Sequence, residues 1–156
     1  MSIRVLFICH GNICRSPMAE FICKAMVAER GLAERFEIAS AATSDEEIWN
    51  GVGNPVYGPA KRKLASVGIS CEGKRARQLT KRDYAEYDYL ICMDAMNVRN
   101  TLRIVGSDPE GKVSRLLAWC GEEGSIADPW YTGDFDTTYT DIVRGLTGFL
   151  AALSME

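Results

Sequence analysis

Residues 3–20 read IRVLFICHGNICRSPMAE, which combines a strand pattern, a short polar loop and a helix pattern. The apolar, β-branched run from Ile3 to Ile8 predicts a buried strand that ends at Cys9. We expect Ser16 as N-cap and Pro17 as first residue of a helix that runs to about Gly31. A loop entering a helix N-terminus directs unpaired N–H groups and the positive end of the helix dipole at one point. The stretch therefore predicts an anion-binding loop.

Cys9 and Arg15 stand at the two ends of this loop. A thiol beside converging donors and a guanidinium is expected to exist largely as thiolate, and the planar fork of arginine fits a tetrahedral oxyanion. The alternative for Cys9 is a small buried residue at a strand end, and C-x5-R alone arises often by chance. C-x5-R-S between a strand and a helix is much more specific. It predicts a sulfur nucleophile that attacks phosphorus in line while Arg15 and the loop N–H groups hold the equatorial oxygens.

The rest of the chain alternates predicted strands with predicted helices. This alternation, with a first strand that is apolar on both faces, predicts a single α/β domain over residues 1–156 with a parallel sheet covered by helices on both sides. Ligands of such folds bind at the carboxyl ends of the strands, where Cys9 lies. The strands are expected at 3–9, 36–41, 87–93 and 113–117, and the main helices at 17–31, 60–67, 94–105 and 138–153. Residues 43–59 and 122–136 are expected as long loops.

Composition narrows the classes of function. The chain has 156 residues, 47% hydrophobic and 25% charged, as is ordinary for a globular protein. A net charge of −3 without a basic block argues against a nucleic-acid partner. No apolar run is long enough to span a membrane, and no signal-peptide pattern precedes the first strand. We therefore expect a cytoplasmic protein without membrane association.

The six cysteines are scattered, so in a cytoplasmic chain we expect reduced thiols rather than disulfides. No Cys-x-x-Cys pair occurs and His10 is the only histidine, which argues against a zinc site. We predict neither a metal nor a cofactor. Cys23, Cys92 and Cys120 are expected in or near the core, and Cys71, in a polar stretch, at the surface.

Several residues of the loop have two interpretations. The Ser16 hydroxyl can cap the helix and can also donate to the thiolate, which would help the sulfur leave in a second step. Asn12 is either a turn residue that tolerates left-handed geometry or one whose side chain fixes the loop, and Gly11 supplies a conformation closed to other residues. Cys14 either packs or captures an oxidised Cys9 as a reversible disulfide.

His10 stands next to the nucleophile and suggests a Cys–His pair. Adjacent residues at a strand end point to opposite sides, so we favour a loop residue that offers its backbone. The predicted phosphate-binding loop comprises His10, Gly11, Asn12, Ile13, Cys14 and Arg15.

Asp128 is the candidate proton donor for the leaving group. The competing interpretation is a turn-capping aspartate, because Asp-Pro is a common turn dipeptide. Pro129 makes the backbone rigid, and Trp130 and Tyr131 follow at once. We expect Asp128 to serve as general acid and then as base for a water. The two aromatic residues are expected to form the wall of a slot for an aryl ring.

Val5 to Glu20 resembles the active-site signature of the low-molecular-weight protein tyrosine phosphatases. Further blocks of that family recur in order, namely Ala76-Arg77-Gln78, Cys92-Met93-Asp94 with Asn97, and Asp128-Pro129-Trp130-Tyr131. The resemblance covers nearly the whole chain. It implies a four-stranded parallel, twisted, Rossmann-like sheet of the phosphotyrosine phosphatase I type and metal-independent hydrolysis of phosphotyrosine.

The resemblance also implies roles and partners. Cys9 is the implied nucleophile, Arg15 the phosphate binder and Asp128 the general acid. The supporting hydrogen-bond network is implied at Asn12, Ser16 and Ser40. The implied partners are phosphotyrosine-containing proteins or peptides and small aryl phosphates, with inorganic phosphate as product and inhibitor.

The chain departs from the family pattern at three places. His10 stands where a small or aliphatic residue is usual. Lys74 or a neighbour lies where a family histidine often joins the network. The loop from Glu46 to Tyr57 looks longer, with residues 49–52 inserted, and Trp49 is our candidate for the aromatic wall that this loop supplies in the family. These departures bear on substrate preference.

Three other functions compete. An arsenate reductase on a similar fold needs two further cysteines that relay a disulfide, and Cys71 and Cys92 lie too far apart to resemble them. A protein arginine phosphatase of the same family usually carries threonine where this chain has Ile13. A non-catalytic phosphate-binding module would need neither a nucleophile nor an acid. We therefore favour phosphotyrosine.

Overall fold

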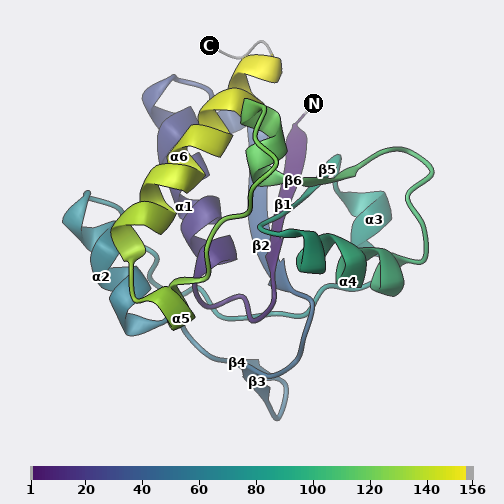
Figure 1. Cartoon of the computed structure of the whole chain (residues 1–156), viewed down its shortest axis with the longest axis horizontal. Coiled ribbons are helices and arrows are strands. Elements are labelled where there is room, and N and C mark those ends of the chain that lie inside the picture. Colours follow the sequence, from purple (N-terminus) through teal and green to yellow (C-terminus); the bar gives the residue numbers. More distant parts are fainter. Residues whose placement is uncertain (1, 154–156) are drawn as a thin grey trace.

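The strand that leads into the loop lies at the centre of the sheet (Figure 1). The computed structural model describes residues 2–153, so residues 1 and 154–156 of the predicted domain lie outside the described residues. The four strands are β1 (Ile3–Cys9), β2 (Phe36–Ala42), β5 (Tyr89–Cys92) and β6 (Val113–Arg115). They pair in parallel in the order β2-β1-β5-β6, which confirms the predicted sheet.

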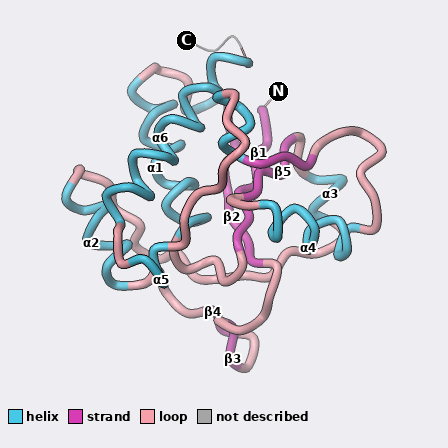
Figure 2. Tube along the Cα trace, in the orientation of Figure 1, coloured by secondary structure: helices cyan, strands magenta, loops and turns pink. Residues whose placement is uncertain are grey.

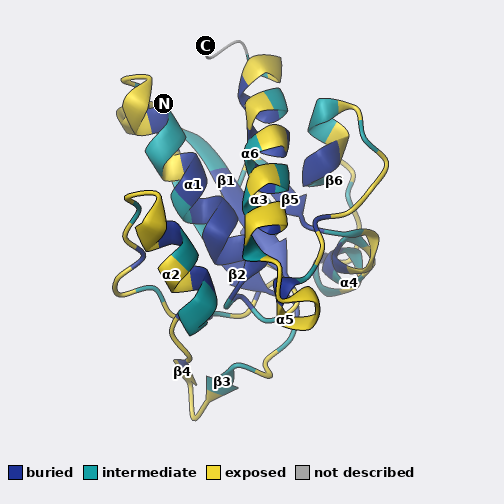
Figure 3. Ribbon diagram, turned by 60° about the vertical axis from the view of Figure 1, so that its left-hand side comes forward, coloured by how far each residue is buried: buried dark blue, intermediate teal, exposed yellow. Residues whose placement is uncertain are grey.

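Helices cover both faces of the sheet, as Figure 2 shows. Val5 and Phe7 of β1 face the larger core, and Leu6 and Ile8 face the smaller one, because successive side chains of a strand point to opposite faces. The larger core is closed by α1 (Arg15–Glu29), α2 (Gly58–Ser66) and α6 (Phe135–Ala152), and the smaller by α3 (Asp83–Glu86) and α4 (Ala95–Val105). Figure 3 shows α6 exposed on its outer side and buried toward the sheet.

Several element boundaries differ from the prediction, and contacts in the structure explain two of them. α6 begins at Phe135, ahead of the predicted Thr138, because the Asp134 side chain accepts the N–H of Thr137 at 2.9 Å and caps the helix. β6 ends at Arg115 because the chain turns into a 3-10 helix, η2 (Leu116–Cys120), that packs under α6. A second 3-10 turn, η1 (Ala33–Arg35), precedes β2.

Both predicted long loops contain short elements. Residues 43–59 include a hairpin of β3 (Ile48–Trp49) and β4 (Val52–Gly53). Its turn residues, Asn50 and Gly51, have φ of 52° and 77°, as two-residue hairpin turns require. The acidic loop contains α5 (Pro129–Thr132). Figure 1 shows α5 and the hairpin at the end of the molecule where β1 and β5 finish.

The expected surface position of Cys71 is wrong. Cys71 is 4% exposed and belongs to the larger core, because the polar residues around it turn outward while its thiol packs inward. Among residues 2–153, no helix is both long and apolar enough to cross a bilayer.

Candidate active site

The Cys9 sulfur is surrounded by hydrogen-bond donors from its own loop. It accepts the N–H of Asn12 at 3.3 Å and of Ser16 at 3.4 Å, and it lies 3.0 Å from the Ser16 hydroxyl oxygen. Cys9 is only 3% exposed. Converging donors of this kind stabilise a thiolate.

The predicted capping role of Ser16 is wrong. α1 begins at Arg15 with Cys14 in the N-cap position and without a side-chain cap, so Pro17 is not the first helical residue either. Because the helix begins earlier, the N–H of Ser16 is free to point at the sulfur. Its hydroxyl contacts Cys9 and Asn12 instead of capping.

Asn12 fixes the shape of the loop. It has a left-handed φ of 59°, and its Nδ2 donates to the hydroxyl oxygens of Ser16 at 2.8 Å and Ser40 at 2.9 Å. Its Oδ1 accepts the N–H of Arg77 at 3.1 Å. The structure thus brings together the three residues expected as a supporting network, and it adds the backbone of Arg77.

This network continues to a buried ion pair that sequence reasoning missed. Ser40 donates to Glu20 Oε1 at 2.6 Å, and Lys74 Nζ lies 3.2 Å from the same oxygen and donates to the Ser40 carbonyl at 3.0 Å. Glu20 is 4% exposed. Burial lowers the pKa of Lys74, although Glu20 opposes the shift. The burial of Glu20 could have been predicted, because it stands between Met18 and Ile22 on one helix and both of these residues face the core.

Arg15 lies at the floor of the site and is 4% exposed. Its Nη1 donates to Asp94 Oδ2 at 2.8 Å and to the Ile126 carbonyl at 2.9 Å. Burial alone would lower the pKa of Arg15, but the Cys9 sulfur and the Asp94 carboxylate raise it overall. Arg15 is therefore a fixed cation beside the sulfur.

The Asp94 carboxylate contacts both Asn97 and Arg15. Its Oδ1 accepts the N–H of Asn97 at 2.7 Å, while the Asn97 side chain accepts the N–H of Asp94 at 3.2 Å. This reciprocal pair caps α4. The other oxygen of the same carboxylate binds Arg15.

Asp128 caps a short helix and also lies close to Arg15. Its Oδ1 accepts the N–H of Trp130 at 3.1 Å, so it caps α5. Its Oδ2 lies 3.7 Å from Arg15 Nη2, and its side chain is 30% exposed. The carboxyl group therefore lies beside the phosphate-binding loop with access to water.

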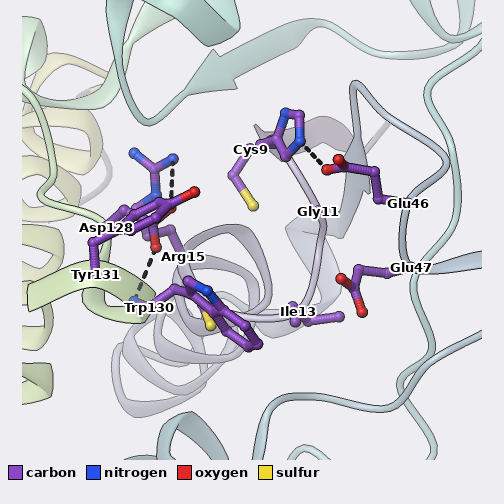
Figure 4. A pocket seen from close by; sticks show the side chains of 11 residues that line it. Cys9, Gly11, Ile13, Arg15, Glu46, Glu47, Asp128, Trp130 and Tyr131 are labelled. Carbon is purple, nitrogen blue, oxygen red and sulfur yellow. Dashed lines mark hydrogen bonds and ion pairs between the residues drawn. The ribbon is translucent and has the colours of Figure 1, made fainter. Parts of the chain in front are cut away.

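A pocket of about 300 Å³ opens over Cys9. It is lined by the phosphate-binding loop, by Glu46 and Glu47, and by the segment that carries Asp128. Figure 4 shows Trp130 and Tyr131 on one side, and Ile13, Glu46 and Glu47 on the other. An apolar and aromatic slot above a phosphate-binding floor suits an aryl phosphate.

Tyr57 supports the aromatic side of this pocket. This role of Tyr57 was not predicted from the sequence. Its ring lies 4.6 Å from the Trp130 ring and 6.2 Å from that of Phe135, centroid to centroid. Its N–H donates to the Ile13 carbonyl at 2.9 Å. One residue therefore contacts both the phosphate-binding loop and the aromatic wall.

Trp49 does not form part of the pocket wall, contrary to our expectation. It is 79% exposed and is not among the lining residues. The reason is the Asn50-Gly51 turn, which folds residues 48–53 into a hairpin that projects outward (Figure 1). Only Glu46 and Glu47, which precede the hairpin, reach the pocket.

The remaining loop residues have distinct surroundings. The His10 side chain is half exposed, lines the pocket rim and pairs with Glu46 rather than with the sulfur. Cys14 is buried, and burial, followed by the charges of Cys9 and Asp128, raises its pKa to about 12. A disulfide between Cys14 and Cys9 stays a prediction. Within residues 2–153, no cluster of metal-ligating side chains is found.

Comparison with known proteins identifies the family. Residues 4–156 match the profile of the family "Low molecular weight phosphotyrosine protein phosphatase". The chain belongs to this family. The relatives from Bacillus subtilis and human are named as tyrosine phosphatases, which are hydrolases.

Relatives match over nearly their whole length. The chain is 36% identical over 156 residues to the phosphatase YfkJ of Bacillus subtilis, which covers 99% of this chain and 97% of the relative. The crystal structure of YfkJ matches with a TM-score of 0.90 and 35% identity over 99% of this chain and 96% of that chain. The human low molecular weight phosphatase is 37% identical over 151 residues, covering 94% and 92%. A Drosophila arginine phosphatase matches with a TM-score of 0.86 and 26% identity, covering 97% and 98%.

Proposed function

We propose that this phosphatase hydrolyses protein phosphotyrosine and small aryl phosphates through a phosphocysteine intermediate on Cys9. The thiolate attacks phosphorus, the bond between phosphorus and the phenolic oxygen breaks, and Asp128 gives its proton to that oxygen. Asp128 then takes a proton from water, whose oxygen attacks the phosphocysteine. Phosphate leaves and the thiolate is restored.

The observation that carries this proposal is the meeting of Cys9, Arg15 and Asp128 at one pocket. Cys9 and Arg15 come from one loop and Asp128 from a distant part of the chain, and each group has the chemistry that one step requires. The donors around the sulfur stabilise it both as nucleophile and as leaving group. Arg15 and the loop N–H groups balance the charge that develops on the equatorial oxygens.

The pocket walls support an aromatic substrate. Trp130 and Tyr131 offer flat surfaces on one side, and Ile13 adds an apolar one on the other. The arginine phosphatase among the structural neighbours makes phosphoarginine the second candidate substrate. We propose phosphotyrosine because the flat faces of Trp130 and Tyr131 match a phenyl ring, and because Ile13 stands where the family's arginine phosphatases are expected to carry threonine.

Two further proposals follow from the chemistry. Inorganic phosphate is the product and fits the same loop, so it should inhibit competitively. A thiolate nucleophile needs a reducing compartment, which supports the cytoplasmic location expected from the sequence.

A substrate comparison tests the proposal. We expect turnover of p-nitrophenyl phosphate and of a phosphotyrosine peptide in the presence of a chelator, and a loss of at least about 10³-fold on Cys9→Ser. Phosphoarginine and, with thioredoxin, arsenate are measured in parallel. Substantial turnover by Cys9→Ser would exclude the nucleophile assignment, and faster release of phosphate from phosphoarginine would exclude the proposed substrate.

A further inference from the structure

The pocket wall opposite Trp130 and Tyr131 is acidic. Glu46 and Glu47, on the segment between β2 and β3, both line the pocket, and Figure 4 shows their carboxyl groups on that side. Carboxylates repel a phosphate dianion, so they do not serve the reacting group itself. The part of a substrate that they can attract lies beside the phosphate.

Glu47 is held in place by neutral partners. Its Oε1 accepts the Asn54 side-chain amide at 2.9 Å, and its carbonyl accepts the Asn54 N–H at 2.8 Å. Its Cγ lies close to Gly11, where an added Cβ would be 3.3 Å away. A neutral amide donor leaves the negative charge in place, and no cation of residues 2–153 lies within 4.0 Å of this carboxylate.

Glu46 differs from Glu47 because His10 binds its carboxylate. The Glu46 carboxylate is therefore occupied by a side chain of the loop, whereas a basic group of a substrate can approach Glu47 without displacing a histidine. The field of Glu47 reaches the pocket: the pKa of Cys14 is raised mainly by burial, and the Glu47 carboxylate is among the charges that add to this shift.

Resting on the proposed function, we infer that Glu46 and Glu47 form an acidic rim that selects phosphotyrosine segments with lysine or arginine beside the phosphotyrosine. When the phosphotyrosine ring enters the slot, the residues before and after it in the peptide lie over the pocket mouth. Consecutive Cα atoms of the peptide are about 3.8 Å apart. A long basic side chain there reaches the rim. Aspartate or glutamate at the same positions is repelled, which gives specificity by charge.

The test uses two phosphotyrosine peptides that differ only in carrying lysine or glutamate on both sides of the phosphotyrosine. The measured quantity is the ratio of their kcat/KM values, lysine peptide over glutamate peptide. We expect a ratio of about two to five at low salt for partly exposed charges. The ratio should approach one in about 1 M NaCl, where charges are screened beyond ~3 Å.

Three variants locate the effect. Glu47→Gln keeps an acceptor for Asn54 and removes the charge, so the ratio should fall toward one. Glu29→Gln is the matched control, because Glu29 is exposed and ends α1 at the far end from the loop. Its ratio should equal that of the wild type. His10→Ala frees the Glu46 carboxylate, so its ratio should rise.

If the wild type and Glu47→Gln gave the same ratio of kcat/KM values, the proposed selection by the acidic rim would be wrong. A preference of the wild type for the glutamate peptide would also contradict it. Binding of both peptides to Cys9→Ser by calorimetry gives the same comparison without turnover. Failure to hydrolyse either peptide, with equal affinities, would overturn the preference together with the proposed function. Hydrolysis of both at equal rates would overturn the preference alone.

Discussion

At the scale of single residues, the loop is held from behind by a buried charge. Asn12 contacts Ser40, Ser40 contacts Glu20, and Glu20 pairs with Lys74. The Lys74 side chain is 12% exposed, so its ammonium depends on Glu20 for compensation. A buried pair of this kind costs little while both partners are present, but it becomes expensive when one is removed.

We predict that Glu20→Gln destabilises the protein by about 3 kcal/mol, because it leaves Lys74 buried without a counter-charge. Glutamine still offers an acceptor to Ser40, so the loss reflects the charge. The double variant Glu20→Gln/Lys74→Met should recover much of the stability. Urea unfolding of the wild type, the single and the double variant measures both effects, and equal stability of the two variants would contradict the explanation.

At the scale of elements, α6 approaches η2 closely because glycines line the contact. A Cβ at Gly148 would lie 2.4 Å from the Trp119 carbonyl oxygen, and one at Gly145 would lie 2.6 Å from Leu116 Cγ. Both neighbours belong to η2, whose turn buries Leu116 and Leu117 under α6. The glycines therefore set the distance between these two elements.

Gly148→Ala is predicted to destabilise the protein by about 2 kcal/mol through overpacking against backbone. This opposes the gain of about 1 kcal/mol that alanine gives over glycine in an open helix. Thr147→Ala is the matched control, since Thr147 is exposed on the same helix. Thermal unfolding decides the point, and a rise in melting temperature for Gly148→Ala would show that the contact can relax.

These elements show which parts of the fold could be predicted from the sequence and which could not. Alternating apolar runs were sufficient to place the strands and main helices, because those patterns are local. The end of β6 was not predictable in this way, because it depends on how closely α6 can approach. The hairpin was predictable in principle, since Asn50-Gly51 is a strong turn signal. The expected position of Trp49 came from the family resemblance, which does not include this turn.

At the scale of the whole molecule, the parallel sheet brings distant residues to one pocket. Cys9, Arg15 and Asp128 could be predicted, because each lies in a recognisable motif. Asp94 also lies in a family motif, but its contact with Arg15 and the contacts of Tyr57 could not be predicted, because they depend on the fold. Asp94 lies 79 positions from Arg15 in sequence, and Tyr57 contacts the aromatic wall through a ring packed between two elements.

The buried thiols predict how stability depends on alkaline pH. Burial raises the pKa of Cys14, Cys23 and Cys92 from 9.0 to about 12. Above pH 9.0 the unfolded chain loses these protons while the folded chain keeps them, so the unfolded state binds fewer protons and stability falls as pH rises. Each thiol contributes a slope of at most about 1.4 kcal/mol per pH unit, between pH about 9 and about 12.

Urea unfolding at about pH 7 and about pH 10.5 measures how much the free energy of unfolding falls between these pH values. This fall should be smaller for Cys23→Ala than for the wild type. The comparison of slopes removes the packing cost of the substitution, which is present at both pH values. Equal losses in the two proteins would mean that Cys23 does not titrate with a raised pKa.

The central claim is that phosphate passes through the Cys9 sulfur. The most direct measurement is acid quench of Asp128→Ala during turnover of p-nitrophenyl phosphate, followed by mass spectrometry of its peptides. The good leaving group needs no acid, whereas hydrolysis of the intermediate lacks its base, so we predict that phosphocysteine accumulates on Cys9. A phosphoryl group on another residue, or turnover without any phosphoenzyme in this variant, would contradict the account.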